Sequence, residues 1–92
     1  MTEIKYRIMG RYVYVRLESH SHDHDVCTIL STLVNVLISA CIRAGIQPKE
    51  YRPGLVFIEA NNVSPYCMEV FETIYPVLLQ VAEDNPDYVQ LN

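Results

Sequence analysis

No Lys or Arg follows Arg52 in this 92-residue sequence. All seven basic residues lie between Lys5 and Arg52, whereas six of the eleven acidic residues follow Arg52 and the net charge is −4. A nucleic-acid-binding protein needs a basic surface that neutralises phosphates. The charge distribution therefore argues against a nucleic-acid partner. It is compatible with a basic protein partner, although an acidic surface is more often simply solvated.

We expect no segment for export, membrane insertion or disulfide bonding. No secretory leader precedes the first polar residues, so we expect a reducing, cytoplasmic location. The longest apolar run, residues 33–42, is interrupted by Asn35 and Ser39 and is shorter than the roughly 20 residues that cross a bilayer. Three cysteines are an odd number, and Cys41 and Cys67 lie in apolar stretches. We expect both of these to be core thiols and expect no membrane span.

The size and composition predict one small domain over residues 1–92. Half of the residues are apolar, which is enough for a hydrophobic core, and the chain has no internal repeat and no low-complexity segment. A domain of this length buries a modest share of its surface, so oligomerisation would stabilise it. We therefore expect a homodimer.

Alternating apolar and polar residues predict the strands. Residues 3–18 alternate on both sides of Gly10 and predict a β-hairpin with that glycine in the turn. The apolar run 55–60 predicts a central strand, and 88–91 predicts a last edge strand. The proline-containing stretch 47–54 is typical of a loop.

A first helix is predicted from Val26 to about Ala44. Asp25 is its expected N-cap, and Gly45 is its expected stop. Its expected buried stripe comprises Leu30, Leu33, Val34, Leu37, Cys41 and Ile42. Another side carries small polar residues that would allow another backbone to approach closely, namely Thr28, Ser31, Thr32, Asn35 and Ser39.

A second helix is predicted to begin after Ser64 as N-cap, with Pro65 at its first position. Pro76 should kink it or leave a carbonyl near Glu72 without its usual donor. The expected apolar face comprises Cys67, Met68, Phe71, Ile74, Tyr75, Leu78, Leu79 and Ala82. The order β-β-α-β-α-β predicts an α+β fold, a single mixed or antiparallel sheet with two helices packed on it.

The junction between the hairpin and the first helix concentrates titratable side chains. Residues 19–27 hold all three histidines and Cys27. The partial positive charge of a helix N-terminus stabilises a thiolate, so Cys27 is placed like a nucleophile with a histidine as its base. His20 ends a strand and is better anchored than His22 and His24. Spacing alone favours a plainer interpretation, in which Cys27 is a buried thiol and the histidines are solvated.

A metal site is the second interpretation of this junction. His20, His22, His24 and Cys27 are all good ligands for Zn²⁺ or Ni²⁺, and alternation in an extended segment would put the three histidines on one side. No second ligand cluster occurs elsewhere in the chain, so such a site would be wholly local. We therefore expect weak, dispensable binding with no physiological metal and no cofactor.

The segment 78–89 resembles the end of the ribosomal-processing cysteine protease family, called Prp, in which an apolar helix leads to a proline and a tyrosine-containing strand. The resemblance extends backward through the order His20, Asp25, Cys27 and Ser31. This chain differs in having Ser19-His20-Ser21 where the family has Gly-His-Ala, and in a shorter loop between His20 and Cys27.

The resemblance implies a cytoplasmic, homodimeric cysteine protease that hydrolyses peptides with a Cys–His dyad. Cys27 would be the nucleophile and His20 the base, with Asp25, Ser31 and His22 as supporting residues. The implied substrate is an N-terminal extension of a ribosomal protein, or of a phage capsid-type protein, and it is expected to be basic. The alternatives are a catalytically inactive Prp-like interaction protein and a protein that binds metal through the local His/Cys cluster.

Overall fold

The computed structural model describes residues 1–19 and 24–92, and the side chains of His24 and Asp25 lie outside this description. The chain forms five strands and two helices in these ranges. In order they are β1 (Thr2–Met9), β2 (Tyr12–Ser19), α1 (His24–Arg43), β3 (Glu50–Arg52), β4 (Leu55–Ala60), α2 (Pro65–Asp84) and β5 (Val89–Leu91).

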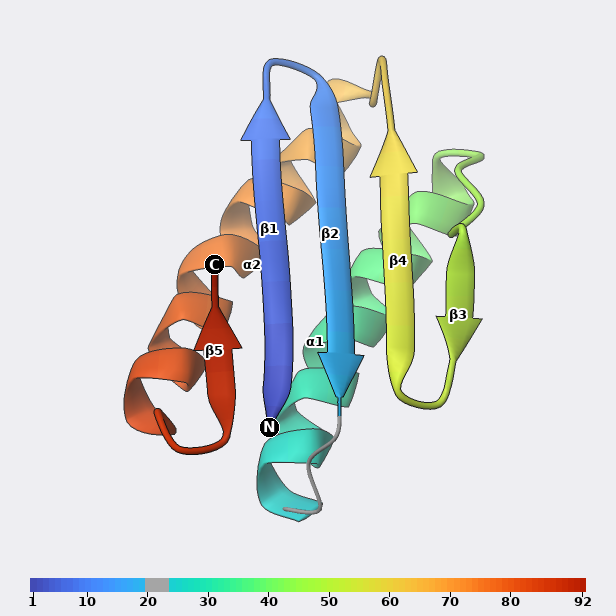
Figure 1. Ribbon diagram of the computed structural model, residues 1–92. Coiled ribbons are helices and arrows are strands. Elements are labelled where there is room, and N and C mark those ends of the chain that lie inside the picture. Colours follow the sequence, from blue (N-terminus) through green and yellow to red (C-terminus); the bar gives the residue numbers. More distant parts are fainter. Residues whose placement is uncertain (20–23) are drawn as a thin grey trace.

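The five strands form one mixed sheet in the order β3-β4-β2-β1-β5. β5 runs parallel to β1, and the other neighbouring pairs are antiparallel. Both helices cover the same face of the sheet, with α2 behind β1 and β5 and α1 behind β2 and β4 (Figure 1). The predicted α+β fold and its element order are confirmed, apart from one short strand that the prediction lacked. The prediction that 47–54 is only a loop is wrong, because residues 50–52 pair with β4 as the edge strand β3.

The core lies between the helix layer and the covered face of the sheet. Alternate residues of β1 and β2 point into it, and α1 and α2 close it from above. Its largest fully buried apolar side chains are Ile4, Val13, Val15, Leu37, Ile58, Val63, Phe71 and Leu78. The Tyr6 hydroxyl donates a hydrogen bond of 2.6 Å to the backbone oxygen of Phe71, which ties β1 to α2 inside this core.

The local signals for turns and caps give the structure that was predicted from them. Gly10 has a φ of +60° in the hairpin turn, where a residue with a Cβ is strained. Gly45 has a φ of +78° directly after α1, and the amide of Ile46 donates to the oxygen of Cys41 at 2.8 Å, as in a Schellman motif. Ser64 caps α2 by accepting from the amide of Cys67, and α2 continues as one helix through Pro76.

Several predictions about the helices are wrong in detail. α1 begins at His24, so Asp25 lies inside its first turn and not at the N-cap position. His24 is therefore helical, so the prediction that it lies in an extended segment is wrong. Ile42 is 58% exposed, because α1 turns the face of Ile38 and Cys41 toward the core. Two apolar residues of α2 that were expected inside are also partly exposed, Tyr75 and Leu79.

α1 is more apolar as a helix than its longest uninterrupted run suggested. Its window from Val26 to Arg43 has a mean hydropathy of 1.8 and is long enough to cross a membrane by length and composition. That criterion is weak evidence, because core helices of soluble proteins also meet it. In this fold α1 packs its buried face, including Leu30, Leu37 and Cys41, against the single core.

Candidate active site

A groove runs between α1 and the end of the sheet formed by β2, β3 and β4. Its volume is about 580 Å³, within the range typical of ligand-binding sites. We call it the Cys27 groove. It is lined by Leu17, Ser19, Cys27, Leu30, Ser31, Val34, Asn35, Tyr51, Arg52, Pro53, Gly54 and Val56.

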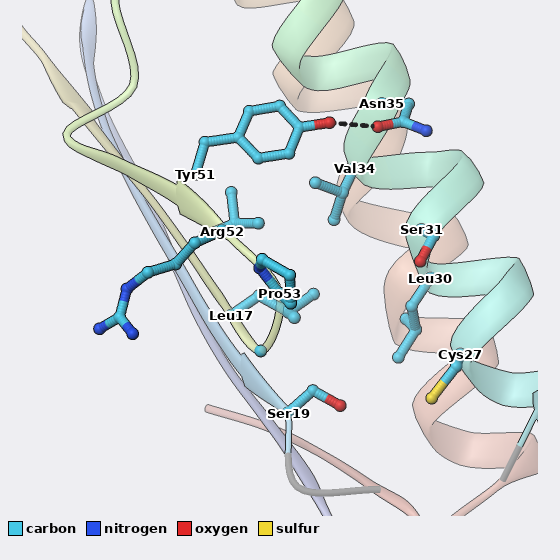
Figure 2. A pocket seen from close by; sticks show the side chains of 12 residues that line it. Leu17, Ser19, Cys27, Leu30, Ser31, Val34, Asn35, Tyr51, Arg52 and Pro53 are labelled. Atoms are coloured by element: carbon cyan, nitrogen blue, oxygen red, sulfur yellow. Dashed lines mark hydrogen bonds between the residues drawn. The ribbon is translucent and has the colours of Figure 1, made fainter. Parts of the chain in front are cut away.

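One wall of the groove is a single stripe of α1. Cys27, Ser31 and Asn35 are spaced four residues apart, so they lie above one another along one side of the helix (Figure 2). Cys27 is half-buried, and Ser31 and Asn35 are exposed. The predicted supporting residue Ser31 therefore shares the groove with Cys27. The small polar stripe predicted from the sequence is exposed and lines this cavity in part.

The start of α1 changes the position of Cys27 within the helix. Cys27 is the fourth residue of a helix that begins at His24, not the second residue of one that begins at Val26. It still lies at the end of the first turn, where the helix dipole acts.

The opposite wall is fixed at Ser19, the last residue of β2. Its amide donates to the oxygen of Gly54 at 2.9 Å, and its hydroxyl lies 3.0 Å from that of Thr2. Gly54 has a φ of +86°, and a Cβ there would lie 3.5 Å from the Ser19 oxygen. Figure 2 shows the Ser19 side chain across the groove from Cys27. The backbone position that immediately precedes His20 is therefore held firmly by two neighbouring segments.

The far end of the groove is bridged by a hydrogen bond that the sequence did not reveal. The Tyr51 hydroxyl donates to Asn35 Oδ1 at 2.8 Å and so connects β3 to α1 (Figure 2). The two residues are 16 positions apart, and the stretch around Tyr51 was predicted to be a loop. In the sequence, one partner of this hydrogen bond could be recognised, because the spacing of Asn35 from Cys27 places both on the same side of the helix.

Among the described residues, the head groups that face the Cys27 groove are uncharged. Leu17, Leu30, Val34 and Val56 supply apolar surface. Arg52 contributes to the lining, but its guanidinium points away in Figure 2 and pairs with Glu50 at 3.6 Å. An acidic wall that would select a basic substrate is therefore absent from this part of the chain.

The other two cysteines lie in the core, as predicted. Cys41 and Cys67 are each 0% exposed, and their thiols hydrogen-bond to one another. Burial raises the pKa of Cys41 from 9.0 to about 12, and it also raises the pKa of Cys67. All three cysteines are thiols and not parts of disulfides. Cys27 is the one of the three that reaches a solvent-open cavity.

The structure does not describe the side chains of the remaining predicted site residues. His20 and His22 lie outside the described residues, as do the side chains of His24 and Asp25. Within residues 1–19 and 24–92, no group of three potential metal ligands gathers.

Among the comparisons with known proteins, the one with solved structures finds the same fold. No family model matches the sequence, and no curated protein matches it. Several solved structures match this chain, among them three that cover its whole length. Two are of the essential ribosomal processing protease Prp from S. aureus, one in complex with a covalently linked product peptide and one with a substrate peptide. They are 20% and 18% identical to this chain, with TM-scores of 0.81 and 98% of their own length covered.

The third is SMU.848 from Streptococcus mutans, which is 21% identical with a TM-score of 0.76 and 92% of its length covered. This chain therefore has the α+β fold seen in these proteins. More particularly, it has the fold of the ribosomal processing protease Prp, so the resemblance seen in the sequence is confirmed at the level of the fold.

Proposed function

We propose that this protein is a cysteine endopeptidase of the Prp type. The observation that carries the proposal is that Cys27, at the first turn of α1, opens into a groove of about 580 Å³ whose opposite wall ends immediately before His20. The similarity in fold to a protease that binds peptides supports the same conclusion.

The proposed reaction uses a Cys–His dyad. His20 takes the proton from the Cys27 thiol, and the thiolate sulfur attacks the carbonyl carbon of the scissile peptide bond. The tetrahedral intermediate collapses as His20 returns the proton to the leaving amine, which leaves a thioester on Cys27. Water, activated by His20, then hydrolyses the thioester and regenerates the thiol. Ser31, one turn after Cys27 in the same groove, is a candidate to hydrogen-bond to the bound peptide.

Anchoring is the reason for choosing His20 over the other histidines. Ser19 is bonded through its amide to Gly54 and through its hydroxyl to Thr2, so the residue after it starts from a fixed backbone position. A catalytic base needs supported geometry to stay within hydrogen-bond reach of its nucleophile. His22 lies two residues further from this anchor and is the next candidate.

The finer parts of the proposal are the substrate, the location and the assembly. The substrate is an N-terminal extension of a ribosomal protein, or of a phage capsid-type protein, and the enzyme is a cytoplasmic homodimer. Among the described residues, no acidic side chain lines the groove, so the lining gives no support for a basic segment at the cleavage site, and any basic character would lie elsewhere in the substrate. Light scattering at micromolar concentration should give a dimer mass, and a monomer mass would reject the homodimer.

Incubation with such extended precursor proteins, followed by mass spectrometry of the products, tests the activity. We expect one cleavage near the N-terminus, loss of turnover by at least about 1000-fold in Cys27→Ala and His20→Ala, and activity retained in His24→Ala. Activity retained in His20→Ala and lost in His22→Ala would move the base by two residues.

Two outcomes would support the alternatives. Precursor binding without cleavage, unchanged by Cys27→Ala, would indicate an inactive interaction protein. Unfolding on addition of a chelator would indicate a structural metal site, because removing a structural metal removes folding free energy.

A further inference from the structure

Side chains close one end of the Cys27 groove, and the distance of that end from Cys27 follows from the helix geometry. Asn35 follows Cys27 by eight residues on the same helix stripe. At 1.5 Å per residue, this separation is about 12 Å along the axis of α1. An extended peptide advances roughly 3.3 Å per residue, so the span corresponds to about three to four residues or one long linear substituent.

Tyr51 closes this span from the other side. Its partner in the sheet is Val56, which is buried beneath α1, so the Tyr51 side chain stands on the covered face. The ring crosses the space between β3 and α1, and its hydroxyl donates to Asn35 Oδ1 at 2.8 Å (Figure 2). Cys27 and Ser19 lie toward the opposite end of the groove in the same view.

The bridge is weak enough to be changed without disturbing the fold. Tyr51 is 53% exposed, and Asn35 is also exposed, so water competes for both partners. Tyr51 also belongs to a three-residue edge strand in which all residues are exposed. The apolar floor formed by Leu17, Leu30 and Val34 lies between the bridge and Cys27, and it belongs to other elements.

We propose that the Tyr51–Asn35 bridge is the end wall of the Cys27 groove and sets how far a bound chain extends from the thiol. Tyr51 and Asn35 are specificity-determining residues in this assignment, and neither takes part in bond making. The assignment as a specificity determinant rests on the proposed protease function, whereas the length of the groove does not.

A series of thiol reagents measures the groove length without a protease substrate. Iodoacetamide and N-alkyl iodoacetamides of increasing chain length each alkylate a thiol by displacement of iodide. The rate at Cys27 is followed by peptide mass spectrometry, and each rate is divided by that of iodoacetamide. This ratio cancels the intrinsic reactivity of Cys27, so a slow thiol, which would count against the proposed protease, leaves the length profile readable.

In the wild type, the ratio should rise with chain length until the substituent spans about 12 Å along the groove and then stop rising. Tyr51→Ala should remove the wall and raise the ratio for the longest reagents at least fivefold. Tyr51→Phe and Asn35→Ala, which remove the hydrogen bond and keep the ring, should give intermediate increases. Tyr88→Ala is the matched control, because Tyr88 is 45% exposed beside β5 at the opposite edge of the sheet.

Identical length profiles in the wild type, Tyr51→Ala and Asn35→Ala would overturn the proposal. An increase in Tyr88→Ala as large as that in Tyr51→Ala would do the same, since it would reflect general loosening. Circular dichroism before labelling checks that each variant is folded, and Tyr51→Phe carries the test if Tyr51→Ala is unfolded.

Discussion

The two ends of α1 present the same chemical group in opposite environments. Near its N-terminus, Cys27 is half-buried and opens into a groove with Ser31 and Asn35. Near its C-terminus, Cys41 is completely buried, and its thiol lies beside that of Cys67 of α2. One amphipathic helix therefore supplies both the wall of a cavity and part of the core. The position of a thiol along the helix, and not its residue type, decides whether it is available for chemistry.

The largest expected difference between the two ends is in alkylation. With a pKa of about 12, Cys41 is about 1000-fold less ionised at pH 8 than a thiol at the ordinary 9.0, and burial restricts access further. In native protein, iodoacetamide should modify Cys27 completely while Cys41 and Cys67 remain unmodified, as seen by peptide mass spectrometry. Denatured protein is the control and should be modified at all three. Equal labelling in the native state would remove the contrast.

Truncating a buried and an exposed side chain of α1 should show the same contrast in the free energy of unfolding. Leu37→Ala removes a fully buried side chain and should reduce the free energy of unfolding by about 2–5 kcal/mol. Ile42→Ala, on the same helix, removes a side chain that is 58% exposed and should change it by less than about 0.5 kcal/mol. Urea unfolding followed by circular dichroism measures both. Similar losses in the two variants would mean that the outer face of α1 is covered in solution.

Alkaline pH should lower the free energy of unfolding, by a smaller amount than the truncation of Leu37. The folded-state pKa of Cys41 lies above its ordinary value because burial disfavours the thiolate, and burial likewise raises the pKa of Tyr6. The stability that comes from keeping these groups protonated in the core is fully present below about pH 9. It is lost as the pH rises from 9 toward 12. Urea midpoints at pH 7.5, 9 and 10 should therefore decline, with a smaller decline in Cys41→Ala. A midpoint that rises over this range would contradict the sign.

Most of the fold could be predicted from local patterns. Strict alternation identified the hairpin, and Gly45 and Ser64 marked the helix ends where the structure has them. β3 was missed because its three residues lie between prolines and are all exposed, so they carry no apolar signal. The burial of Ile42 was wrongly predicted because a periodic stripe does not reveal how a helix is rotated on its sheet.

The candidate site was predicted only on one side. Cys27 and Ser31 were recognisable by their position at a helix start and their spacing of one turn. The opposite wall depends on contacts between distant segments, such as Ser19 with Gly54 and Asn35 with Tyr51, which form only after β3 and β4 pair. Local sequence patterns contain no information about such pairings. The histidine that serves Cys27 stays a prediction.

The rate of Cys27 alkylation by iodoacetamide at pH 7 in the wild type, His20→Ala and His24→Ala tests the account most directly, because it probes the dyad without any assumption about the substrate. If His20 is the base of Cys27, His20→Ala should slow the reaction at least tenfold, whereas His24→Ala should leave it within about twofold of the wild type. Equal rates in all three proteins would contradict a dyad between Cys27 and His20.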